Sequence, residues 1–388
     1  MPPSPPLERN SLQNEWRLLL ACASPVTAPE KLYLLIPTVD WSHLLALAED
    51  HGVTGQLTMS LHKLGASAVP ASIHQTLMDR RREQVFYTLK LSAELFRILD
   101  QFATEKIAAL VVKGPVLAMQ AYGDPAMRSY GDLDLLVRQR DIRRATELML
   151  SASYQAAISI AAIDSGKIPG QYLFSRPEAK LLVELHNDFT LRYFPRRLPL
   201  EKFFERQIRV RLDAHDAPAL CVEDELVLIC IHGAKHFWER LIWIADVAAL
   251  VTRQTHIDWR RVAESAKEVG AERMLHTGLR LAKNLLRMPL PPETMAAVEA
   301  DSQSARLAEQ ILRWLPAAGY APGLFERAVF RLRMRGGFLA APAYLLRLSL
   351  SPTEEDWQAG PGENRHGFLE ALRRPLRLAR KYGRTGKS

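Results

Sequence analysis

Two aspartates stand two residues apart in GDLDLLVR, a segment whose other residues favour a buried strand. Strands disfavour aspartate, and a buried carboxylate is costly unless it is paired or bound to a metal. If Asp132 and Asp134 both lie in the strand, their side chains share one face, with Cα atoms roughly 6.5 Å apart. Such carboxylates can hold one or two divalent cations, and Mg²⁺ (or Mn²⁺) would leave positions for substrate phosphates. The alternative is a half-exposed strand with two solvated aspartates.

Three further features favour metal-dependent phosphate chemistry near this pair. Glu184, in LLVELH, is also flanked by strand-forming residues and could reach the same face from a neighbouring strand. Lys113 and Gly114 lie between an apolar run and a short helix, where backbone N–H groups and a lysine can bind an anion. Arg128 could pair with the carboxylates or with a phosphate. Taken singly, Gly114 could be an ordinary turn glycine and Arg128 a surface arginine. The order and spacing of these residues favour a phosphate-binding site.

A second polar group lies downstream, in a segment that the pattern predicts to be one long helix from about Glu225. At 100° per residue one sector of this helix is polar, whereas the other faces are apolar. The sector contains His232, Lys235, His236, Glu239, Trp243 and Asp246. We expect it to line the same cleft as the aspartates. Two alternatives are a core pairing of His236 with Asp246 and an independent hydrolase-type metal site on His232 and His236.

The surrounding sequence indicates which elements position these residues. Residues 1–104 are expected to be helical, with one helix running from an N-cap at Asp40 to Gly52. Residues 105–215 predict a strand (IAALVV), a short helix, a strand (DLDLLVR), an amphipathic helix, and a hairpin around RPEA. Residues 216–350 are expected to form a helical domain, in which Asp258 starts another helix, and residues 351–388 a loop and a basic tail.

Composition is that of an ordinary globular protein, with 388 residues, 48% hydrophobic and 24% charged. Three cysteines without paired metal spacing argue against a disulfide framework and favour a reducing, cytoplasmic setting. We expect no signal peptide and no transmembrane segment, since no apolar run reaches about 18 residues. The net charge is +8, but residues 365–388 hold eight basic residues against one acid. This tail could meet an anionic partner or be a solvated helix end.

The segment LVVKGPVLAMQAYGDPAMRSYGDLDLLV resembles the nucleotidyltransferase superfamily with the DNA-polymerase-β-type fold. It is most similar to the bacterial "uncharacterised nucleotidyltransferase" family, and the similarity covers most of residues 30–383. The family pattern of Lys-Gly, Tyr, Arg, Asp-x-Asp and acid-x-His is met by Lys113, Gly114, Tyr122, Arg128, Asp132, Asp134, Glu184 and His186. Pro115 departs from the superfamily's usual Gly-Ser or Gly-Gly, and it offers a phosphate neither hydroxyl nor N–H.

This resemblance implies an α/β (α+β) nucleotidyltransferase core with a mixed sheet, flanked by helical N-terminal and C-terminal regions. The implied reaction moves a nucleoside monophosphate from an NTP, expected to be ATP, to a small-molecule, peptide or protein acceptor. Asp132, Asp134 and Glu184 are the expected metal ligands and catalytic residues. The expected nucleotide-binding residues are Lys113, Gly114, Arg128, His232, Lys235 and His236. The alternatives are an inactive nucleotide-binding or nucleic-acid-interacting protein of this fold, and a phosphohydrolase using the later histidines.

Overall fold

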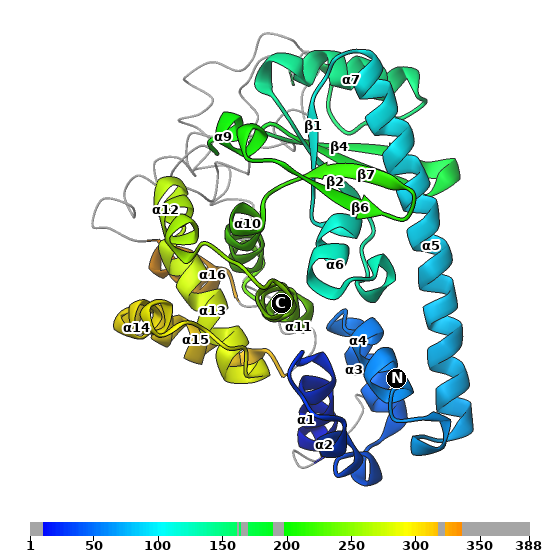
Figure 1. The fold of residues 1–388 in the computed structure, drawn as a ribbon, viewed down its shortest axis with the longest axis vertical. Coiled ribbons are helices and arrows are strands. Elements are labelled where there is room, and N and C mark those ends of the chain that lie inside the picture. Colours follow the sequence, from blue (N-terminus) through cyan, green and yellow to red (C-terminus); the bar gives the residue numbers. More distant parts are fainter. Residues whose placement is uncertain (1–10, 161–162, 164–169, 189–197, 317–322, 336–388) are drawn as a thin grey trace, which may run out of the picture.

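The computed structural model describes residues 11–160, 163, 170–188, 198–316 and 323–335, and its centre is a mixed β-sheet flanked by helices (Figure 1). Within these residues the sheet has seven strands in the order β3-β4-β5-β2-β1-β7-β6. The strands are β1 (Ala109–Val112), β2 (Leu133–Val137), β3 (Gln155–Ala156), β4 (Gln171–Arg176), β5 (Leu181–His186), β6 (Ile208–Leu212) and β7 (His215–Ala219). This sheet is compatible with the predicted α/β class. The predicted loop and basic tail, 351–388, lie outside the described residues.

Helices precede, interrupt and follow the strands. Those before the sheet are α1 (Ser11–Ala23), α2 (Pro29–Tyr33), α3 (Trp41–Asp50), α4 (Thr54–His62) and α5 (Ala71–Thr104). Those between strands are α6 (Gly114–Tyr122), α7 (Ile142–Ser151) and α9 (Leu200–Glu205). Those after it are α10 (Val222–Lys235), α11 (Leu241–Arg253), α12 (Trp259–Val269), α13 (Glu272–Leu286), α14 (Pro292–Ala300), α15 (Ser302–Trp314) and α16 (Leu324–Arg333). None of the helices in this part of the chain is both long and apolar enough to cross a membrane.

The register of the central strands determines which residues meet. β1 pairs antiparallel with β2 and parallel with β7, and β2 pairs parallel with β5. Asp134 therefore lies opposite Val112 on one side and Glu184 on the other. Since side chains alternate along a strand, the two acids of neighbouring strands point to one face of the sheet.

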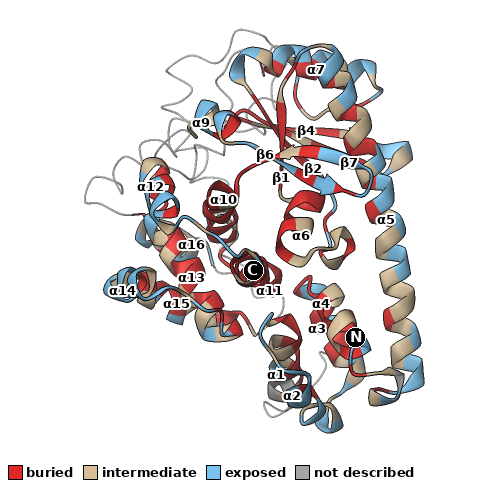
Figure 2. Ribbon diagram, in the orientation of Figure 1, coloured by how far each residue is buried: buried red, intermediate tan, exposed pale blue. Residues whose placement is uncertain are grey.

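The two faces of the sheet belong to different hydrophobic cores. Leu133 and Leu135 pack with α5, α7 and the edge strands. Leu136, on the same face of β2 as Asp134, packs with α6, α10 and α11. Figure 2 shows α10 and α11 as almost entirely buried helices beside this face. The carboxylates therefore point towards the C-terminal helices.

The helices that precede the sheet in the sequence and those that follow it share one hydrophobic core. Leu18 and Leu44, from α1 and α3, belong to the same buried cluster as Ile244 and Leu279, from α11 and α13. The 34-residue α5 runs along one side of the molecule past both the N-terminal helices and the sheet (Figure 1). Its beginning packs in the first core and its end in the second. The predicted boundaries at 104 and 215 stay predictions.

Most predicted elements occur near their expected positions. Asp40 and Asp258 accept hydrogen bonds from the backbone N–H of His43 and Arg261, so both are the predicted N-caps. The hairpin around RPEA is β4–β5, and the strands IAALVV and DLDLLVR contain β1 and β2. The hairpin β6–β7, which extends the other edge of the sheet, was not predicted.

The prediction of one long helix from about Glu225 is wrong, because α10 ends at Lys235 and a separate helix, α11, begins at Leu241. The N–H of Trp238 donates to the carbonyl of Gly233, and the N–H of Phe237 donates to that of Ala234. This is a Schellman motif, whose left-handed position is usually glycine. Here Phe237 takes it, with φ of 58°. Trp238 is fully buried against Gly233, where a Cβ would lie 2.5 Å from its ring. Packing of Trp238 therefore imposes a helix end that the local sequence does not signal.

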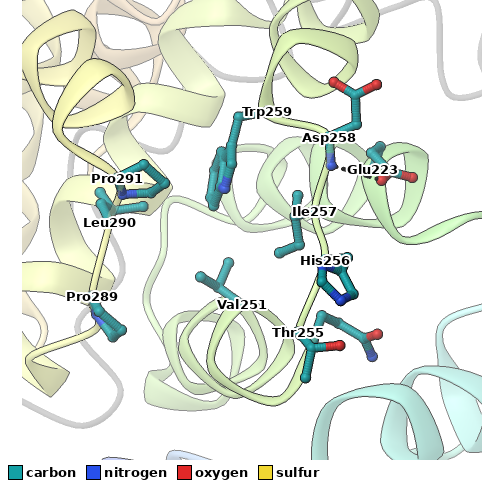
Figure 3. A pocket seen from close by; sticks show the side chains of 11 residues that line it. Glu223, Val251, Thr255, His256, Ile257, Asp258, Trp259, Pro289, Leu290 and Pro291 are labelled. Carbon is teal, nitrogen blue, oxygen red and sulfur yellow. Dashed lines mark hydrogen bonds between the residues drawn. The ribbon is translucent and has the colours of Figure 1, made fainter.

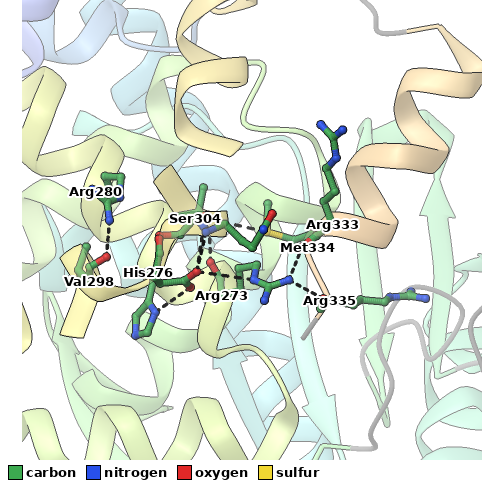
Figure 4. A network of polar contacts seen from close by, with 11 residues as sticks. Arg273, His276, Arg280, Val298, Ser304, Arg333, Met334 and Arg335 are labelled. Atoms are coloured by element: carbon green, nitrogen blue, oxygen red, sulfur yellow. Dashed lines mark hydrogen bonds and ion pairs between the residues drawn. The ribbon is translucent and has the colours of Figure 1, made fainter. Parts of the chain in front are cut away.

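Polar contacts join the last described helices, as Figure 4 shows. Arg273 of α13 donates to the carbonyls of Arg333 and Arg335. Asp301 accepts two backbone N–H groups at the start of α15 and lies 3.1 Å from Nδ1 of His276. These contacts fix α15 and α16 against α13.

A buried ion pair links the residues before β2 to α11. Nε of Arg128 lies 2.9 Å from Oδ2 of Asp246, with the side chains 8% and 2% exposed, and the hydroxyl of Tyr122 donates to Oδ1. Removing one partner leaves an uncompensated buried charge. We expect Asp246→Ala to lower the free energy of unfolding by about 3–5 kcal/mol, measured by denaturant titration.

The exposed pair of Arg143 and Glu147 provides the control. Glu147→Ala should change the free energy of unfolding by less than about 1 kcal/mol. Arg128→Met combined with Asp246→Leu should lower the free energy of unfolding by much less than the sum of the two single substitutions, because the double variant leaves no unpaired charge. Additive losses would show that the two side chains do not depend on each other.

Candidate active site

A cavity of about 500 Å³ opens beside the carboxylates and brings the predicted residues together. Its walls come from α5, from the segment before β2, from the ends of β1, β2 and β5, and from α10 and α11. The predicted residues that line it are Lys113, Arg128, Asp132, Asp134, Glu184, His232, Lys235 and His236. It also contains His186, Gln171, Arg240 and Trp243. Gly114 lies just behind Lys113, as the first residue of α6.

The closest group of ligating atoms consists of Asp134, Glu184 and His186, which each offer one atom within 4.8 Å of the others. Nε2 of His186 lies 2.8 Å from Oδ1 of Asp134 and 3.3 Å from Oε2 of Glu184. Glu184 and His186 are two residues apart in β5, so they share the face on which β2 presents Asp134. The strand register thus positions all three side chains.

Lys113 compensates the charge of Asp134 in this structure. Its Nζ lies 3.0 Å from Oδ2 of Asp134, whose side chain is 3% exposed. Burial alone would raise the pKa of Asp134, but the Lys113 charge and the His186 hydrogen bond outweigh it and hold the pKa well below its ordinary value. Burial opposes the charge of His186 too, yet its hydrogen bonds to Asp134 and Glu184 raise its pKa. Two carboxylates, a lysine and an imidazole therefore share one cluster.

Asp132 occupies a different position from Asp134. It precedes β2, is partly exposed and lines the cavity next to the close group. Burial, followed by repulsion from Asp134, raises the pKa of Asp132 to about 6. A cation near Asp134 would relieve this repulsion. The donor set of carboxylates and an imidazole fits a divalent cation, provided that His186 gives up its proton.

Glu225 is a buried residue of this site that the sequence analysis missed. Its Oε1 accepts the backbone N–H of Lys113, and its side chain is fully buried. Lys113 has φ of 58° and Gly114 φ of 49°, both in the left-handed region. A non-glycine residue there is strained, so Glu225 holds a turn that other residues would leave. The sequence showed only three acids at the start of a helix, which is the usual dipole pattern.

The opposite wall contains an aromatic group from α10 and α11. The ring centroids of His232 and His236 are 4.7 Å apart, and those of Trp243 lie 5.6 and 5.2 Å from them. Nζ of Lys235 donates to Gln171, whose amide donates in turn to Glu184. Four residues of the predicted polar sector therefore line the same cavity as the carboxylates, although two helices carry them. Glu239 and Asp246, the other two members of the sector, are not among the residues that line it.

The structure contradicts one alternative for the stripe and gives no support to the other. Asp246 is bonded to Arg128 and Tyr122, so the alternative of a core pair between His236 and Asp246 is wrong. Within the described residues, the three side chains that could hold a metal together are Asp134, Glu184 and His186. Neither His232 nor His236 belongs to this group.

A second and larger cavity, of about 730 Å³, lies between α10, α11 and the segment before α14 (Figure 3). Its two acids are engaged in helix starts: Glu223 accepts the backbone N–H of Asp258, and Asp258 caps α12. The rest of its lining is mostly apolar, including Trp259 and Leu290. It offers binding surface but no cluster of reactive groups.

The fold and this arrangement are compatible with an α/β nucleotidyltransferase. A family model described as "Uncharacterised nucleotidyltransferase" matches residues 37–287, which include the whole lining of the smaller cavity. The chain belongs to this family of uncharacterised nucleotidyltransferases. No curated protein matches the chain.

Titration of Glu225 gives a pH prediction. Burial raises the pKa of Glu225 from 4.5 to about 7. A carboxyl whose pKa rises on folding stabilises the fold at low pH, and this contribution is lost as the pH rises through about 7. The shift corresponds to about 3 kcal/mol. Glu225→Gln keeps an oxygen for the Lys113 N–H but does not titrate.

We therefore expect the free energy of unfolding of the wild type to fall by about 3 kcal/mol relative to Glu225→Gln between pH 4 and pH 8. Denaturant titrations at several pH values measure this difference. Glu147→Gln, on the exposed surface of α7, is the matched control and should follow the wild type. Parallel curves for the wild type and Glu225→Gln would contradict the assigned ionisation.

Proposed function

We propose that the chain is a metal-dependent nucleotidyltransferase that moves a nucleoside monophosphate from an NTP, expected to be ATP, to an acceptor. The observation that carries this proposal is the buried cluster of Lys113, Asp134, Glu184 and His186 at one end of a 500 Å³ cavity. Family membership supports transferase chemistry. The acceptor is a small molecule, a peptide or a protein.

The acidic residues have the roles of metal binding and proton acceptance. Asp134 and Glu184, with Asp132 beside them, hold Mg²⁺ or Mn²⁺, and His186 is a further ligand. A divalent cation held by these residues would supply positive charge near the phosphate groups of the substrate. Burial would raise the pKa of Glu184, but its hydrogen bond to His186 outweighs this and lowers the pKa. Glu184 is therefore ionised near pH 7 and can accept a proton from the acceptor's nucleophile.

The basic residues bind the triphosphate. Lys113, whose Nζ lies 3.0 Å from Asp134, is the residue that would contact a phosphate if a cation took its place beside the carboxylate. The turn at Lys113 and Gly114 opens α6, and N–H groups at a helix start favour anions. Pro115 removes one of these groups, so the lysine carries more of the contact. Arg128 reaches the phosphates only with the nitrogens that Asp246 leaves available.

Transfer of label tests the reaction. The protein is incubated with each α-³²P-labelled NTP, Mg²⁺ and a host lysate, and labelled products and pyrophosphate are measured. We expect transfer with the wild type and a loss of at least about 100-fold with Asp134→Asn, because the metal-bound charge acts in the transition state. Asp216→Asn, the same change at an exposed residue of β7, should leave transfer unchanged.

Circular dichroism is needed alongside, because Asp134 also neutralises Lys113. A folded Asp134→Asn variant with full transfer would contradict the metal assignment. A wild type that releases no pyrophosphate and labels no acceptor would contradict the proposed reaction.

The role of Lys113 predicts a selective loss of nucleotide affinity. Lys113→Ala should weaken binding of a non-hydrolysable NTP by about tenfold or more, since it removes a charge-assisted contact. It should not weaken Mn²⁺ binding without nucleotide, because the lysine no longer competes for Asp134. Calorimetry measures both, with Lys63→Ala, at the exposed residue that follows α4, as the control. Unchanged nucleotide affinity would place Lys113 outside the phosphate site.

A further inference from the structure

The wall of the cavity formed by His232, His236 and Trp243 differs chemically from the carboxylate end. Its three rings contact one another, with centroids 4.7–5.6 Å apart. The two imidazoles are partly exposed, whereas Trp243 is buried and packs against both. All three line the cavity. The wall is therefore a supported aromatic surface and not a pair of separate polar side chains.

The histidines of this wall are uncharged at neutral pH. Burial, reinforced by the charge of Lys235, lowers the pKa of His236 to about 4. Burial, reinforced by Lys113, holds the pKa of His232 well below its ordinary value. A neutral imidazole has an aromatic face, one donor and one acceptor, but no charge for a phosphate. The cations of the same cavity are Lys113, Lys235, Arg128 and Arg240.

The geometry points to a nucleobase site: we propose that His236, whose ring is tilted by only 31° to the neighbouring ring of Trp243, binds the base of the NTP by stacking. His232, whose ring is tilted by 54° to that of His236, contacts the edge of the base. The cavity then separates the substrate into two parts, with phosphates at the lysines and carboxylates and the base at the uncharged rings. Because stacking increases with ring area, the site favours purine over pyrimidine nucleotides. This inference rests on the proposed function and adds to it the residues that bind the base and the reason for a purine.

The joint between α10 and α11 makes this surface rigid. His232 belongs to the last turn of α10, His236 is the C-cap that follows this helix, and Trp243 belongs to the first turn of α11. The Schellman motif at Phe237 and Trp238 sets the angle between the two helices. A rigid aromatic surface loses little conformational entropy on binding. The three rings are therefore arranged before the base binds.

Calorimetry with two ligands tests the proposal. The first ligand is α,β-methylene-ATP, and the second is inorganic tripolyphosphate, which has no base. His236→Ala should weaken binding of the nucleotide about ten- to hundredfold while changing tripolyphosphate affinity less than about twofold. His236→Phe, which keeps an aromatic face without the imidazole nitrogens, should retain most of the nucleotide affinity. Equal losses for the two ligands, or equal losses in the two variants, would overturn stacking.

A measurement on the wild type avoids dependence on the variants. ATP and GTP analogues should bind about tenfold more tightly than CTP and UTP analogues of the same phosphate chemistry. Equal affinity for all four would overturn the purine site while leaving the proposed transferase intact. If the wild type bound tripolyphosphate at least as tightly as every nucleotide, the base site would be rejected, but the phosphate site would not. Absence of binding for every ligand would reject the proposed function itself.

Discussion

The buried charge of Asp134 is the constraint on which the rest of the site depends. A carboxylate with 3% exposure is stable only if cations or donors surround it, and Lys113 and His186 provide them here. Each partner in turn requires a particular backbone. His186 needs the parallel register of β5 with β2, and Lys113 needs the left-handed turn that Glu225 holds. One carboxylate therefore links the sheet, α6 and α10.

Helical elements with local signals could be predicted from the sequence. The N-caps at Asp40 and Asp258 form hydrogen bonds within three residues, so the sequence contains the whole interaction. The end of α10 differs, because Phe237 takes a backbone conformation that is usually found at glycine. Trp238 packs against Gly233 of α10 and against Gly278, which is forty residues further along the chain. The β6–β7 hairpin is a local pairing, and it was missed because its two-residue turn, Asp213-Ala214, contains no glycine or asparagine to mark a hairpin.

The acidic residues of the site could be predicted from the sequence, but the contacts among the site residues could not. Strand alternation was sufficient to suggest that Asp134 and Glu184 share a face. It could not show that Asp132 precedes β2, or that His186 lies between the two acids, because both depend on the register of β5. Glu225 had no distinguishing signal. Its role comes from a contact with Lys113, 112 residues away. The metal, nucleotide and catalytic roles of these residues stay predictions.

The measurement that tests the account most directly is the anomalous diffraction of a crystal grown with Mn²⁺ and a non-hydrolysable ATP analogue. The account predicts a manganese peak about 2 Å from a carboxylate oxygen of Asp134. It also predicts that Nζ of Lys113 leaves Asp134 and contacts a phosphate oxygen. A nucleotide bound while Lys113 still pairs with Asp134, with no manganese at the carboxylates, would contradict the account.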